Sequence, residues 1–145
     1  MTCYDSNLEH VWQLNITGVD SIARFYDDVI YWGGGGQGWQ GAPVHKISYD
    51  GKIIWTKKFD GITYPLRGDI ALLRAEGEGS TGLRLVDMET EEMLTHIHQR
   101  KRNFAIKETT TDQFTIKFSD TYTSYNDESA IWVTYDIKGN ILHQE

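Results

Sequence analysis

The chain has 145 residues, of which 39% are hydrophobic and 24% charged, and its formal net charge is −7 at pH 7. This length is typical of one domain with its own core, and an acidic surface repels nucleic acid and anionic lipid while it attracts cationic partners. The single cysteine, Cys3, favours a reducing compartment, and no basic, apolar leader or membrane-length apolar run is present, so we expect a cytoplasmic protein.

The first predicted strand covers residues 10–15. Its centre, Val11-Trp12-Gln13-Leu14, resembles Ile54-Trp55-Thr56-Lys57, and a glycine follows each tryptophan at the same spacing, Gly18 and Gly61. Because the later piece ends a repeat, we interpret residues 10–15 as a repeat's last strand that precedes the first full copy. It is expected to cover the inner edge of that copy or to pair with the chain's last strand.

Three similar segments follow, at about residues 19–59, 60–99 and 100–145. Short apolar or alternating runs in each are separated by turn residues roughly every 8–12 positions, which is the all-β pattern. The predicted strands are 22–25, 29–32, 44–48 and 53–56; then 62–64, 70–73, 83–87 and 93–95; then 104–107, 114–118, 131–136 and 141–143. The sequence therefore predicts one all-β domain, 1–145, of three four-stranded antiparallel repeats.

Residues 87–99 are the main helix candidate, because acidic residues near their start would suit a helix dipole. The match of Leu83-Arg84-Leu85-Val86-Asp87 with the other copies favours a strand there instead. Asp50, Asp87 and Asp136 are predicted to be equivalent residues that end the third strand and form the turn after it. Gly51 and Gly139 can supply the positive φ that such a hairpin needs.

The segment from Val44 to Trp55 resembles the outer hairpin of a quinoprotein-type or WD-type β-propeller blade, and Asp28-Val29-Ile30-Tyr31-Trp32-Gly33-Gly34 resembles its inner strand. The second copy departs from the pattern with Met88-Glu89-Thr90, and the third with Ile137-Lys138-Gly139. Propellers close with roughly four to eight blades. Three copies therefore imply an open, half propeller; two chains that complete a ring, or a β-sandwich, are the alternatives.

No enzymatic constellation is found. The glycine-rich stretch 33–41 lacks the Lys-Ser/Thr pair and the helix of a phosphate loop, so it is either a flexible loop or a contact loop that presents Trp39. His96 and His98 would share one face of a strand, where structural histidines are favoured over a metal site with Glu91, Glu92 or His143 as further ligands. We expect no enzyme activity, no metal and no cofactor.

The remaining pattern favours recognition. Residues 119–129 mix tyrosine, serine, asparagine and acids, as recognition loops do. In size and charge the chain is similar to immunity proteins of bacterial contact-dependent growth inhibition systems, which implies an inhibitor that blocks the active site of a basic toxin, a nuclease (RNase), in a 1:1 complex without nucleic acid or membrane. A carbohydrate or small-ligand binding module is the alternative. The predicted contact residues are Trp39, Glu76, Glu78, Asp120, Tyr122, Tyr125, Asp127 and Glu128.

Overall fold

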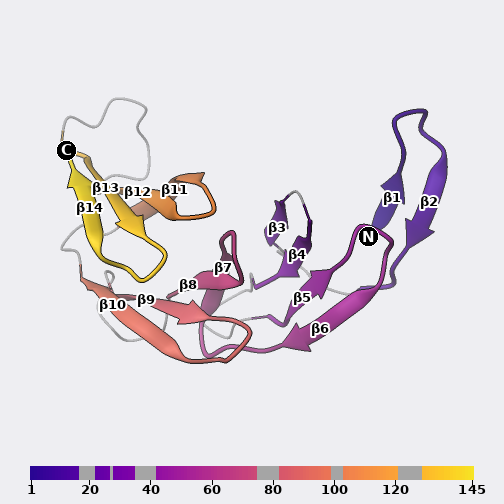
Figure 1. Ribbon diagram of the computed structural model, residues 1–145, viewed down its shortest axis with the longest axis horizontal. Helices are drawn as coiled ribbons and strands as arrows, with labels where there is room; N and C mark the ends of the chain where they lie inside the picture. The colour runs from indigo at the N-terminus through magenta and orange to yellow at the C-terminus, as the bar shows by residue number, and fades with distance from the viewer. Residues whose placement is uncertain (17–21, 27, 35–41, 75–81, 99–102, 121–128) are drawn as a thin grey trace. The chain divides into compact units, whose positions relative to one another are not determined.

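The computed structural model describes residues 1–16, 22–26, 28–34, 42–74, 82–98, 103–120 and 129–145 (Figure 1). Strands and turns make up these residues, and none of them forms a helix that could cross a membrane. The chain divides into two compact units, Met1–Tyr64 and Pro65–Glu145. The predicted all-β class is confirmed.

Three sheets each contain four antiparallel strands that follow one another in chain order (Figure 1). The first contains β3 (Ile22–Phe25), β4 (Ile30–Gly33), β5 (Val44–Ile47) and β6 (Ile53–Lys57). The second contains β7 (Ile62–Pro65), β8 (Ile70–Arg74), β9 (Gly82–Asp87) and β10 (Met93–His98). The third contains β11 (Asn103–Thr109), β12 (Gln113–Ser119), β13 (Ile131–Asp136) and β14 (Ile141–Gln144). The three predicted four-stranded repeats are confirmed, and residues 93–98 form a strand rather than a helix.

The core lies on the second and third strands of each sheet. Ile70, Ala71, Leu72 and Leu73 of β8 are all buried, on both faces of the strand, whereas all four residues of β14 are exposed. An inner strand that is covered on both faces is an almost continuous apolar run, and an edge strand is not. This difference explains why the sequence indicates β8 more clearly than β14.

The N-terminal strand pairing differs from the prediction. β2 (His10–Gln13) neither covers the first repeat's inner edge nor pairs with the chain's last strand; it forms a separate two-stranded sheet with β1 (Thr2–Tyr4) (Figure 1). The sequence reasoning missed β1 because Leu8 stands where the later turns have Gly51 and Gly139. The chain therefore begins with the third and fourth strands of a repeat, a half repeat, before the three complete ones.

The turn between the third and fourth strands is built in the same way in all four hairpins. The residue before the turn donates its N–H to the carbonyl that closes the turn, at 2.9 Å in each hairpin, and its own carbonyl accepts from a residue with positive φ. Its side chain also accepts backbone N–H groups, as Asx and Ser turns do. These capping residues are Asp5, Ser48, Asp87 and Asp136.

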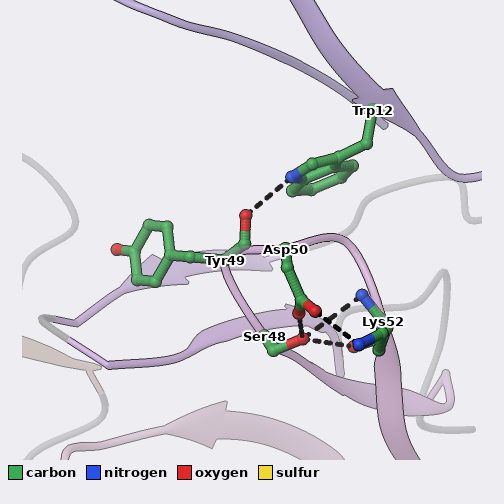
Figure 2. A network of polar contacts seen from close by, with 5 residues as sticks. All are labelled: Trp12, Ser48, Tyr49, Asp50 and Lys52. Carbon is green, nitrogen blue, oxygen red and sulfur yellow. Dashed lines mark hydrogen bonds and ion pairs between the residues drawn. The ribbon is translucent and has the colours of Figure 1, made fainter.

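The predicted equivalence of Asp50 with Asp87 and Asp136 is therefore wrong. Ser48 occupies the capping position in the first repeat, and Asp50 lies two residues further on, where its carboxylate pairs with Lys52 at 2.7 Å (Figure 2). That pairing holds the pKa of Asp50 below its usual value. The sequence analysis assigned the capping role two residues too late, because a serine side chain can cap the same backbone groups.

A β-bulge recurs in the fourth strand of every hairpin. The strand register skips one residue in each, and the skipped residue is a large, exposed apolar side chain. A bulge disrupts the ladder and so protects an edge strand from pairing with another chain. The bulged residues are Val11, Ile54, Leu94 and Leu142.

In the described part of each unit, a turn glycine lies close to the outer strand of the preceding hairpin. A Cβ on Gly51 would lie 2.6 Å from the Trp12 ring, and one on Gly139 would lie 2.1 Å from Cγ2 of Thr95. Trp12 and Thr95 occupy equivalent positions, directly after the bulged residues. Figure 2 shows that Trp12 also donates its indole N–H to the carbonyl of Tyr49, at 2.8 Å. The same packing thus joins successive repeats at two places.

We expect Gly139→Ala to destabilise the protein more than Gly68→Ala does. Both glycines have positive φ, at 86° and 77°, so both substitutions carry the left-handed penalty of about 1–2 kcal/mol. Only Gly139 has a neighbour, because nothing lies within 4 Å of a Cβ on Gly68. Urea unfolding of the two variants measures the difference.

Thr95→Ser provides the matched rescue. It removes the Cγ2 methyl that a Cβ on Gly139 would meet, so the double variant should recover the excess loss of Gly139→Ala over Gly68→Ala. Equal destabilisation by Gly139→Ala and Gly68→Ala, or additive losses in the double variant, would contradict the proposed turn-to-strand packing.

Candidate functional site

The eight predicted contact residues belong to one type of connection, the one between the second and third strands of each sheet. Trp39 lies between β4 and β5, Glu76 and Glu78 lie between β8 and β9, and the other five lie between β12 and β13. The sequence reasoning chose them for their chemistry, loop by loop. The strand order shows that the three loops are topologically equivalent.

Of these eight residues only Asp120 is among the described ones. It is exposed and follows β12 directly, after the buried Ser119. The other seven, Trp39, Glu76, Glu78, Tyr122, Tyr125, Asp127 and Glu128, lie in 35–41, 75–81 and 121–128, outside the described residues.

The two ends of every sheet carry different connections. Because neighbouring strands are antiparallel, the first-to-second and third-to-fourth turns share one end of a sheet, and the second-to-third loop leaves from the other. The turn end is tied together by backbone hydrogen bonds, such as Met88 N–H to the Asp69 carbonyl at 2.7 Å and Ile137 N–H to the Asp112 carbonyl at 3.2 Å. The loop end is where the candidate contact residues begin.

Gly33 and Gly34 fix the start of the first loop. A Cβ on Gly33 would lie 1.9 Å from the Pro43 carbonyl oxygen, and one on Gly34 would lie 2.3 Å from that of Thr63. Gly34 donates to Pro43 at 3.2 Å and accepts from the Thr63 N–H at 2.8 Å. Both glycines have positive φ. Glycine is therefore required at the first two positions of the glycine-rich stretch, because other backbone segments approach them too closely for a side chain.

His45 lies one residue beyond Val44, the first residue of the strand that follows this loop. Its Nδ1 contacts the Thr56 hydroxyl at 2.8 Å, and its strand partner on the other side is Trp32. Burial lowers the pKa of His45. Burial therefore favours the neutral imidazole over the charged form at this position.

His96 and His98 lie on one face of β10, as predicted, with their rings stacked 5.6 Å apart at 13°. Within the described parts of the chain no group of three or more His, Cys, Asp or Glu side chains is placed to hold a metal ion. His143, one of the further ligands considered, contacts the Glu145 carboxylate at 2.9 Å.

Three of the described tryptophans are already engaged. Trp12 packs on the Gly51 turn, Lys57 lies over the Trp55 ring at 5.5 Å, and Lys107 and Lys117 lie over the Trp132 ring at 4.3 and 5.4 Å. A sugar stacks on an open aromatic face, and these cations occupy the ring surfaces at Trp55 and Trp132. These three tryptophans therefore give the carbohydrate alternative no support.

No protein-family model matches the chain, and a search of curated proteins finds no similar sequence.

We expect His45→Gln to weaken the pH dependence of stability. Because the folded-state pKa lies below the unfolded value of about 6.5, the unfolded chain binds more protons, and the stability that neutral His45 contributes is lost as the pH falls below that value. Urea unfolding of both proteins at about pH 7.5 and about pH 5.5 measures the loss. The same loss in His45→Gln would show that other groups cause it.

Proposed function

We propose that the chain is a cytoplasmic inhibitor that binds a basic protein toxin, a nuclease, through the three second-to-third-strand loops. The observation that carries this proposal is the equivalence of those loops. Residues chosen for their chemistry from three separate parts of the sequence fall at the same position of three repeats. Loops on a rigid β scaffold are where binding residues concentrate.

The charge of these loops supports a basic partner. Residues 34–43, 75–81 and 120–130 contain five acidic and no basic residues, so they carry −5 of the net −7. The opposite ends of the sheets mix both signs, since the turns there include Lys52, Arg67 and Lys138. Acidic loops without lysine or arginine steer a cationic partner towards themselves and repel nucleic acid, the polyanion that such a toxin binds.

The chemistry of the loops fits an active-site blocker. Carboxylates of Asp120, Asp127 and Glu128 can take the places of substrate phosphates, because they accept hydrogen bonds from the same arginine and lysine side chains. Trp39, Tyr122 and Tyr125 provide large, rigid side chains of the kind that dominate binding energy at interfaces. This is the role of an immunity protein, which forms a 1:1 complex with its cognate toxin.

The first test is a pull-down from the native cytoplasm, together with co-expression of the protein encoded immediately upstream. A basic, toxic protein held in an equimolar complex, with growth rescued, would support the proposal. If nothing binds and the upstream protein is harmless, the proposal fails. A hit on a glycan array under those conditions would favour the carbohydrate alternative.

In that complex, Trp39→Ala or Tyr125→Ala should weaken binding by about 2 kcal/mol or more if either side chain is a hot spot. Titration calorimetry measures the change. Phe25→Ala is a suitable control, because Phe25 is 62% exposed and lies at the turn end of its sheet. Unchanged affinity in both loop variants would show that the site is elsewhere.

Charge can be tested with two pairs of substitutions in the same sheet. Glu76→Gln with Glu78→Gln removes two charges from the loop end, and Glu89→Gln with Glu92→Gln removes two from the turn end. The loop pair should slow association more and reduce its salt dependence more, because charges near an interface act mainly on the association rate. Equal effects would mean that net charge alone, not the loop surface, steers the partner.

A further inference from the structure

The paired histidines of β10 lie at the surface and take no part in the core. His96 and His98 flank the buried Ile97, so both side chains project from the opposite face of the strand. Both are exposed. Their rings lie nearly parallel, at 13°, with 5.6 Å between the centroids. The fold therefore holds two imidazoles next to each other without using either for packing.

The ring nitrogens of this pair have no partner in the described part of the chain. His45 and His143 each place a ring nitrogen next to a side-chain oxygen, at 2.8 and 2.9 Å. Among the described residues, neither His96 nor His98 has a hydrogen bond or an ion pair. Their nitrogens can therefore bind an external ligand without losing a contact within the protein.

The backbone of β10 is held firmly around the two histidines. Ile97, between them, is 3% exposed and pairs with Leu83, which is 2% exposed. Thr95, directly before His96, lies beneath the Gly139 turn. Only side-chain rotations remain to be fixed when the two rings bind one ligand, and a preorganised pair loses less conformational entropy on binding.

The separation of the two rings matches that of two imidazoles on one tetrahedral ion. With a zinc–nitrogen distance of about 2.0–2.1 Å, the ring centre lies about 3.2 Å from the metal, so two rings at the tetrahedral angle have centres about 5.2 Å apart. At the right angle of a square-planar ion this distance would be about 4.5 Å. The observed 5.6 Å is closer to the tetrahedral value. Rotation of each exposed ring about its Cβ–Cγ bond then turns one nitrogen towards a common point.

The neighbours of the pair determine which kind of ion fits. Gly82 lies opposite His98 and has no side chain to fill the space, and Arg84 lies opposite His96. The one carboxylate of β9 and β10 belongs to Asp87, which caps the turn at their other end. Nitrogen coordination, not charge attraction, must therefore hold a cation here. This excludes Mg²⁺ and Ca²⁺, which take oxygen ligands, and favours a metal ion that imidazole binds well.

We propose that His96 and His98 bind one Zn²⁺ ion, each through one imidazole nitrogen, with water in the remaining positions. Zinc sites commonly have three or four protein ligands, so this is an open site whose other positions can be taken by a ligand from another molecule. Two protein ligands are enough for such a site, and the sequence expectation of no metal is revised here. The inference does not depend on the proposed inhibitor function.

Calorimetric titration of the whole chain with zinc tests the site, at about pH 7.5, where an ordinary imidazole is neutral. The wild-type protein should bind one Zn²⁺ per chain and should give no response to Mg²⁺. His96→Asn and His98→Asn should each weaken zinc binding at least about tenfold, because the second imidazole binds intramolecularly, at a high effective concentration. A smaller loss in either variant, or a wild-type protein that binds no zinc, would overturn the proposal.

His143→Asn is the matched control. It also removes an exposed histidine from an outer strand, and the His143–Glu145 pair is the competing site, with a ring nitrogen and a carboxylate oxygen 2.9 Å apart. This variant should bind zinc as the wild-type protein does, and loss of the ion in His143→Asn would overturn the proposal. Nitrogen NMR of the imidazoles gives a second measurement: one equivalent of zinc should shift the His96 and His98 signals together. A shift at one of these rings alone would contradict chelation.

Discussion

The contact of a tight turn with the outer strand of the preceding hairpin organises this protein. At Gly51 and Gly139 the turn backbone approaches Trp12 and Thr95 so closely that even a methyl group has no room. The contact depends on several local features at once: a capping side chain that shapes the turn, a residue with positive φ at its tip, and a bulge that places the next residue of the outer strand beneath it. A repeat protein is stabilised by such nearest-neighbour contacts, so one recurring geometry determines how each unit is assembled.

The same geometry shows where the half repeat resembles the complete repeats and where it differs from them. The turn of the half repeat has the same hydrogen bonds as the other turns, and Trp12 packs against the turn of the next repeat. On this side the half repeat therefore packs as a complete repeat does. Its other side differs in two ways: Leu8 replaces the glycine, and Tyr4 is exposed where the other repeats bury an apolar residue. A strand edge of this kind is a risk for aggregation unless it is covered.

Much of the fold could be predicted from the sequence, because β4 and β8 are nearly continuous apolar runs, β12 alternates apolar and polar residues, and the turns carry glycine or aspartate. The failures have local causes. β1 is short and ends in a turn without glycine, so its sequence pattern is weak. Without β1, the sequence could not predict the strand with which β2 pairs. Ser48 caps a turn as an aspartate would, which misplaced the equivalence of Asp50. For the candidate site, composition identified the loops, but their shared position between second and third strands depends on strand order, which only the pairing of strands establishes.

The two ends of the sheets meet different physical demands, and this favours the loop end for binding. At the turn end, capping side chains, positive-φ residues and backbone hydrogen bonds are all committed to packing repeat on repeat, so a substitution there changes stability first. At the loop end, the described residues show the strand ends and the close approach of Gly33 and Gly34. Loops on such a scaffold tolerate changes in length and chemistry. Their lengths and compositions do differ between the three repeats, from glycine-rich to acidic and tyrosine-rich, although the strands around them are alike. A constant scaffold with three unlike loops at one position is the arrangement expected where recognition, not folding, sets the sequence.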